Sequence, residues 1–111
     1  MKILLVDDDE AYLSTLAVVV RSMGHDVLTA DGAKLAQDLL VRHESDIKLI
    51  ISDFKMPGIS GSELKDWVIA RNSGIKFLLS SGSADESVEI DLIKPFGKNE
   101  LLEAIEKFQK I

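Results

Sequence analysis

Asp53 is the side chain in this sequence that is best placed to do chemistry. It ends the apolar run Leu49-Ile50-Ile51, and the turn residues Met56-Pro57-Gly58 follow before the next helical pattern begins. In a sheet of parallel strands, ligands bind and reactions occur at the carboxyl ends of the strands. An aspartate at a strand end is most often a helix cap or a turn former. Because Ser60 is the expected cap of the following helix, Asp53 remains a candidate for chemistry.

Four more polar side chains stand at the ends of other apolar runs. Asp7 and Asp8 follow the first run, Ser81 follows the fourth, and Lys94 follows the fifth. If these runs are parallel strands of one sheet, their carboxyl ends lie along one rim, and the side chains become neighbours in space. Carboxylates brought together in this way repel one another, and a hard divalent cation such as Mg²⁺ would relieve the repulsion.

A rim of this composition suits phosphoryl chemistry. A carboxylate can act as a nucleophile and hold a phosphoryl group as an aspartyl phosphate. The developing charge needs a metal ion, a cation and hydroxyl donors, and Lys94 and Ser81 can supply the last two. Taken singly, most of these residues have a common structural explanation: Asp9 would cap a helix, Ser81 would form part of a turn, and Lys94 would be a surface lysine. Their joint placement at four strand ends favours a site.

The elements that must position these residues follow from the apolar periodicity. Strands are predicted over Lys2–Val6, Asp26–Ala30, Ile47–Ser52, Ile75–Ser80 and Glu89–Ile93, and helices over Glu10–Met23, Ala33–His43, Ser60–Asn72 and Lys98–Gln109. Short continuous apolar runs are typical of strands buried on both faces. Regular alternation of strand and helix predicts a parallel sheet with helices on both faces. The length of 111 residues is that of one domain.

Composition excludes several other classes of function. The chain has no cysteine, which rules out disulfides, thiol catalysis and cysteine-based zinc sites. The formal net charge of −6 argues against nucleic acid as a direct partner and is compatible with divalent cations. No apolar run approaches the roughly 18 residues of a membrane span, and no signal peptide is recognised. We therefore expect a soluble, cytoplasmic protein with no nucleic-acid or membrane partner.

Four motifs at the strand ends carry a resemblance to a known family. They are Leu5-Val6-Asp7-Asp8, Ser52-Asp53 with Met56-Pro57-Gly58 and Gly61, Ser81-Gly82, and Lys94-Pro95-Phe96. At these spacings the sequence resembles the receiver domain of response regulators in bacterial two-component systems, and the resemblance covers the whole chain. It implies a flavodoxin-like (CheY-like) α/β fold with five parallel strands in the order 2-1-3-4-5, formed by a single receiver domain over residues 1–111.

The resemblance implies a phosphoacceptor and a metal site. Asp53 would accept a phosphoryl group from a phosphohistidine on a histidine kinase or a histidine phosphotransfer protein. Mg²⁺ would be bound directly by Asp8, Asp53 and the backbone carbonyl of Lys55. Asp7 would act on the ion mainly through water.

Two further residues would hold the transferred group. The resemblance implies that Ser81 and Lys94 bind phosphoryl oxygens after transfer. It also implies that the Lys94–Pro95 peptide bond is cis, although only about 5–6% of X-Pro bonds in folded proteins are cis. Lys55, two residues after Asp53, would lie at the mouth of the site. There it would pair with the phosphoryl group or block the hydrolytic water, and we expect a long-lived phosphoryl state.

The segment between the fourth and fifth strands departs from the family pattern. Ser81 and Lys94 are only 13 positions apart, so the usual fourth helix is predicted to be shortened or missing. Ile90 and Leu92 are predicted to share one face of a half-exposed strand, and the fourth strand shows a similar alternation. The sheet face would then be partly wet in a monomer, or a partner such as a second copy would cover it in a weak homodimer.

Asp91 stands where the family has its switch aromatic, so we expect the loop Gly82–Ser87 to carry the signal by an order–disorder change.

The departures leave three functional hypotheses. The first choice is a phosphoacceptor receiver domain that alters protein–protein docking and is not a turnover enzyme. A phosphorylation-independent interaction module is the alternative. An aspartyl-phosphate hydrolase is the weakest, because Lys55 stands where a second acid is needed.

Overall fold

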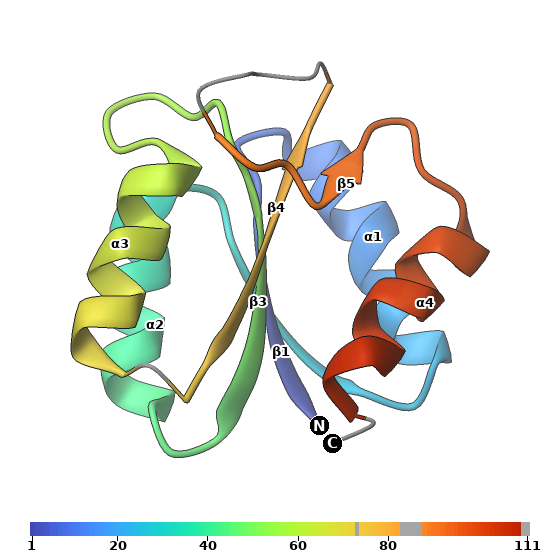
Figure 1. Ribbon diagram of the computed structural model, residues 1–111, viewed down its shortest axis with the longest axis horizontal. Helices are drawn as coiled ribbons and strands as arrows, with labels where there is room; N and C mark the ends of the chain where they lie inside the picture. The colour runs from blue at the N-terminus through green and yellow to red at the C-terminus, as the bar shows by residue number, and fades with distance from the viewer. Residues whose placement is uncertain (73, 83–87, 110–111) are drawn as a thin grey trace.

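The computed structural model describes residues 1–72, 74–82 and 88–109, and strands and helices alternate as predicted from residue 2 to residue 81 (Figure 1). The strands are β1 (Lys2–Val6), β2 (Asp26–Ala30), β3 (Ile47–Asp53), β4 (Lys76–Ser81) and β5 (Leu92–Ile93), and the helices are α1 (Glu10–Ser22), α2 (Ala33–His43), α3 (Gly61–Arg71) and α4 (Lys98–Gln109). Over the described part of the chain, none of these helices combines the length and apolar character needed to cross a lipid bilayer.

The strands form one parallel sheet in the order β2-β1-β3-β4-β5, which confirms the predicted topology. Figure 1 shows α2 and α3 on one face of the sheet and α1 and α4 on the other. Because every strand runs in the same direction, the carboxyl ends of β1, β3, β4 and β5 lie along one edge. The residues that follow these strands are therefore brought together by the topology alone.

The sheet is held in register by two hydrophobic cores, one on each face. In β1, Leu4 and Val6 lie in the core beneath α2 and α3, whereas Ile3 and Leu5 lie in the core beneath α1 and α4. None of the four is more than 2% exposed. Burial of each such side chain contributes roughly 1.5–3 kcal/mol. A slip of one residue would move every side chain to the opposite core, so the register at the strand ends is strongly specified.

Side-chain caps fix the starts of α1 and α3, the helices that follow β1 and β3. Asp9 caps α1, because its Oδ1 accepts the backbone N–H of Tyr12 at 3.1 Å. Ser60 caps α3 in a reciprocal capping box with Glu63. Both caps were predicted from the sequence. The carboxylate of Asp53 therefore has no capping role at α3.

Gly61 allows the start of α3 to approach the end of β3 closely. Its backbone N–H donates a hydrogen bond of 2.8 Å to the carbonyl of Phe54. A Cβ atom at this position would overlap the carbonyl oxygen of Asp53 and lie 2.9 Å from the Cα of Phe54. Glycine is required here because any side chain would push the helix away from the strand end.

The prediction of a five-residue fifth strand is wrong, because only Leu92 and Ile93 pair with β4. The side chain of Asp91 explains the short ladder. Its Oδ2 accepts the N–H of Leu79 at 2.8 Å, and its own N–H donates to the carbonyl of Leu79 at 2.9 Å. The carboxylate thus occupies the position that a backbone carbonyl of a longer strand would take, and regular pairing begins only after it.

The prediction of a half-exposed fourth strand is also wrong. Every residue of β4 from Phe77 to Ser81 is buried. Ile90 packs against the core beneath α2 and α3, whereas Leu92 belongs to the core beneath α1 and α4, so the two do not share a face. Ile90 precedes β5, and strand alternation therefore does not apply to it. Exposed apolar surface is found instead at Ile93, which is 46% exposed.

Two predictions about the connection between β4 and β5 lie outside the described residues. The shortened or missing fourth helix and the signalling loop Gly82–Ser87 both depend on residues 83–87. Residues 88–91 are described, and they are not helical.

We expect Asp91→Ala to lower the free energy of unfolding by about 1 kcal/mol, because the N–H of Leu79 loses its charged acceptor. Asp91→Asn keeps an oxygen acceptor in the same place and should retain most of the stability. Urea unfolding followed by circular dichroism measures both variants. Equal stability of Asp91→Ala and the parent chain would show that the Asp91 carboxylate does not hold β5 against β4.

Candidate functional site

Three carboxylates converge at the edge of the sheet where β1 and β3 end. Asp53 is the last residue of β3 and its side chain is 13% exposed, while the side chain of Asp7, directly after β1, is 4% exposed. Asp8 is exposed beside them. One carboxylate oxygen from each residue lies within 4.8 Å of the other two. The three aspartates are therefore close enough to share one cation.

Lys94 brings a positive charge into this group of carboxylates. Its Nζ donates to Oδ2 of Asp7 at 2.7 Å and lies 3.3 Å from Oδ1 of Asp53. The backbone N–H of Lys94 donates to the carbonyl of Ser81 at 2.7 Å, which ties the end of β5 to the end of β4. The Lys94–Pro95 peptide bond is cis, as expected.

The remaining predicted residues lie at the same edge. Ser81 is the last residue of β4 and is 2% exposed, next to Ser80, whose Oγ donates to the carbonyl of Ser52 at 3.4 Å. Lys55 is exposed, two residues beyond Asp53. The topology thus places Asp7, Asp8, Asp53, Ser81 and Lys94 at one edge of the sheet, with Lys55 in the loop that follows β3.

Sequence reasoning missed Tyr12, in the first turn of α1. The Nζ of Lys94 lies 4.3 Å from the centroid of the Tyr12 ring. One signal was available: Tyr12 stands three residues after the cap Asp9, and a residue one turn into a helix that begins at a strand end lies close to that end.

Burial and neighbouring charges shift the protonation of two groups in the site. Burial raises the pKa of Asp53, the charge of Lys94 partly offsets this shift, and the charge of Asp7 adds to it. Burial alone would lower the pKa of Lys94, but its hydrogen bond to Asp7 and the charges of Asp7 and Asp53 raise the pKa overall. Lys94 is therefore positively charged, and the negative charge of ionised Asp53 is only partly compensated by its neighbours.

The donor set of the site fits a hard divalent cation. Three carboxylates face one ammonium, so the group carries an excess of negative charge when Asp53 is ionised. Mg²⁺ prefers oxygen ligands, takes one or two carboxylates in most protein sites and keeps several waters. Asp8, which is exposed, leaves the cluster open to solvent on one side.

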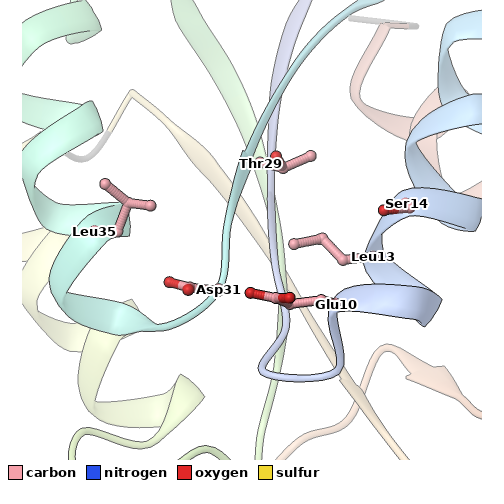
Figure 2. A pocket seen from close by; sticks show the side chains of 6 residues that line it. All are labelled: Glu10, Leu13, Ser14, Thr29, Asp31 and Leu35. Carbon is pink, nitrogen blue, oxygen red and sulfur yellow. The ribbon is translucent and has the colours of Figure 1, made fainter.

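A hollow lies at the same edge of the sheet, between the starts of α1 and α2 (Figure 2). Its volume is about 300 Å³, and its lining includes the carboxylates Glu10 and Asp31 and the partly exposed Leu35. None of the predicted site residues lines it. The two places are therefore distinct.

Comparison with known proteins identifies the family. A family model described as the response regulator receiver domain matches residues 3–106. The chain therefore belongs to the response regulator receiver domain family, whose members serve two-component signalling. Receiver domains interact with histidine kinases or phosphotransfer proteins.

Individual relatives agree with this assignment. The response regulator protein FleR of Pseudomonas aeruginosa is 33% identical over 113 residues, which cover 94% of this chain and 24% of FleR. A response regulator receiver protein from Pseudomonas putida is 29% identical, with a TM-score of 0.84 over 96% of this chain and 95% of that chain. A signal receiver domain from Pseudomonas fluorescens, 24% identical, shares the fold with a TM-score of 0.89 over 98% of this chain and 94% of that chain. The chain spans about a quarter or less of the first curated relatives, at 24%, 14% and 12% of their lengths.

We expect Asp53→Asn to raise the unfolding midpoint at neutral pH when divalent cations are absent. The folded-state pKa of Asp53 is raised above its ordinary value near 3.8, so the folded protein binds this proton more tightly than the unfolded chain does. The protonated carboxyl of Asp53 therefore contributes stability that is fully present below pH 3.8 and is lost as pH rises through the raised pKa. Above that window, ionised Asp53 destabilises the fold, and asparagine removes the charge.

Thermal unfolding in a chelator at several pH values tests this expectation. The advantage of Asp53→Asn over the parent chain should be largest at neutral pH and should shrink as pH falls through the raised pKa of Asp53. An advantage that stays constant with pH, or no advantage at all, would contradict the unfavourable ionisation of Asp53.

Proposed function

We propose that Asp53 accepts a phosphoryl group from a phosphohistidine on a histidine kinase or a histidine phosphotransfer protein, in a reaction that requires Mg²⁺. One observation carries the proposal: the ammonium of Lys94 contacts the carboxylates of both Asp7 and Asp53, and an oxygen of Asp8 lies within 4.8 Å of an oxygen of each of these aspartates. Family membership supports the same function.

The proposed reaction is a transfer between two side chains. A carboxylate oxygen of Asp53 attacks phosphorus, an O–P bond forms, and the N–P bond to the partner's imidazole breaks. Bound Mg²⁺ would neutralise charge on the phosphoryl oxygens. Lys94, whose Nζ lies 3.3 Å from Asp53, is placed to pair with one phosphoryl oxygen. Ser81, buried at the end of β4, is proposed as a hydroxyl donor to another.

The contacts of Asp7 support an indirect role at the metal. Its Oδ1 accepts the N–H of Asp9 at 2.9 Å, and its Oδ2 accepts from Lys94 at 2.7 Å. Both oxygens therefore already have protein donors. We assign the direct Mg²⁺ ligands to Asp8, Asp53 and the backbone carbonyl of Lys55, with Asp7 acting through water.

The product of this reaction is the modified protein itself, so we class residues 1–111 as a single receiver domain and not as a turnover enzyme. Phosphorylation is proposed to alter docking to a further protein, in the cytoplasm where its family operates. We propose that the chain acts as a monomer or as a weak homodimer through the sheet face that the fourth helix of the family would cover.

A small phosphodonor tests the proposed function directly. With acetyl phosphate and Mg²⁺, intact-mass measurement should detect one phosphoryl adduct, and Asp53→Asn should abolish it. Chelation of Mg²⁺ should slow the reaction by more than tenfold, because the metal meets charge that Lys94 alone does not neutralise. Absence of any adduct would favour a phosphorylation-independent interaction module, and steady hydrolysis of the donor would favour a hydrolase.

Lys55 is predicted to prolong the phosphoryl state. Its exposed ammonium, two residues after Asp53, can pair with the phosphoryl group and hinder the hydrolytic water. We expect Lys55→Ala to hydrolyse the adduct several-fold faster, while Lys65→Ala, a change at a lysine on α3, should leave the rate unchanged. Decay of the adduct is followed by intact mass after the donor is removed. An unchanged lifetime in Lys55→Ala would refute this role.

A further inference from the structure

Tyr12 contacts the charged end of Lys94, and the proposed reaction gives it no role. The Nζ of Lys94 lies 4.3 Å from the centroid of the ring, within the range of a cation–π contact. Burial raises the pKa of the Tyr12 hydroxyl, so the ring stays uncharged at neutral pH. The face of the ring therefore presents its negative electrostatic potential to the ammonium.

Tyr12 belongs to a closed circuit of contacts around the site. The N–H of Asp9 donates to Oδ1 of Asp7 at 2.9 Å, and Oδ1 of Asp9 accepts the N–H of Tyr12 at 3.1 Å. The ring of Tyr12 meets the ammonium of Lys94, which donates to Oδ2 of Asp7 at 2.7 Å. The cap of α1 thus fixes the backbone of Tyr12 relative to the same carboxylate that binds Lys94.

The geometry points to Tyr12 as a positioning residue for Lys94. A lysine ammonium is a point charge on a flexible stem of four carbons, and it has many rotamers to lose. An aromatic face attracts the ammonium without using one of its N–H donors. Lys94 can therefore exchange a carboxylate acceptor for a phosphoryl acceptor while its ammonium stays over the ring. The inference rests on the proposed function, since positioning of Lys94 matters for catalysis only if Asp53 accepts a phosphoryl group.

Two variants separate the ring from the bulk of the side chain. Tyr12→Phe keeps the aromatic face, whereas Tyr12→Leu fills similar space with apolar bulk and has no face to offer a cation. Val18→Ala is the matched control, because Val18 lies on the same helix and is 66% exposed. Unfolding midpoints of all three variants establish that each is folded.

The contact itself is measured by nuclear magnetic resonance, independently of phosphorylation. Protons on the Cε of Lys94 should be shifted upfield by the ring current in the parent chain, in Tyr12→Phe and in Val18→Ala, and not in Tyr12→Leu. Loss of the upfield shift in Tyr12→Leu assigns it to the ring of Tyr12, the one tyrosine among the aromatic residues of the chain. Lack of an upfield shift in the parent chain would overturn the inference.

The catalytic consequence is measured as the rate of adduct formation with acetyl phosphate and Mg²⁺. We expect Tyr12→Leu to slow this rate by about three- to tenfold, in line with a partly desolvated cation–π contact. Tyr12→Phe and Val18→Ala should react at close to the parent rate. A Tyr12→Leu rate equal to the parent rate would refute the positioning role, as would an equal loss in Tyr12→Phe, since that would assign the effect to the hydroxyl.

The two proposals fail in different ways. A parent chain that forms no adduct defeats the phosphoacceptor function, and with it the catalytic part of this inference, whatever the ring-current shift shows. A parent chain that forms the adduct, with Tyr12→Leu reacting equally fast, leaves the phosphoacceptor function intact and removes Tyr12 from it.

Discussion

The ion pair between Lys94 and Asp7 is the interaction on which the whole site depends. The side chain of Asp7 is 4% exposed, and a carboxylate so deeply buried is unfavourable unless it is paired and hydrogen-bonded. Loss of one partner from such a pair typically costs about 3–5 kcal/mol. The pair also joins the end of β1 to the end of β5, across 87 positions of sequence. Among the described residues, no buried side-chain nitrogen or oxygen lacks a hydrogen-bond partner.

The same ion pair leaves the site short of positive charge. The Nζ of Lys94 lies 2.7 Å from a carboxylate oxygen of Asp7 and 3.3 Å from one of Asp53, so one ammonium pairs with two carboxylates. A third carboxylate, that of Asp8, lies close to both of them. Burial raises the pKa of Asp53 in spite of Lys94. A divalent cation would correct this imbalance, and a phosphoryl group on Asp53 would give Lys94 a stronger acceptor. The chemistry proposed for the site therefore follows from an incomplete balance of charge that the fold imposes.

Local patterns predict the parts of the structure that depend on nearby residues. The central strands follow from continuous apolar runs, and the cap at Ser60 follows from its spacing to Glu63. The alternation of strands with helices predicts a parallel sheet, in which Asp53 and Lys94 meet at one edge. Two other contacts between distant segments do not follow from such patterns. Asp91 shortens β5 through a hydrogen bond to a residue of β4, and the ring of a residue in α1 contacts Lys94 only because the cap of that helix places it at the sheet edge. Neither contact has a periodic signal in the sequence.

The most direct test of the site is a crystal structure of the protein with Mg²⁺ and beryllofluoride, a stable mimic of a phosphoryl group. We predict beryllium bonded to a carboxylate oxygen of Asp53, Mg²⁺ bound by Asp8 and Asp53, and Nζ of Lys94 within hydrogen-bond distance of a fluorine atom. Beryllofluoride bound away from Asp53 would contradict the phosphoacceptor role. So would an Asp53 that carries no adduct and keeps its contact with Lys94 at saturating concentrations of both reagents.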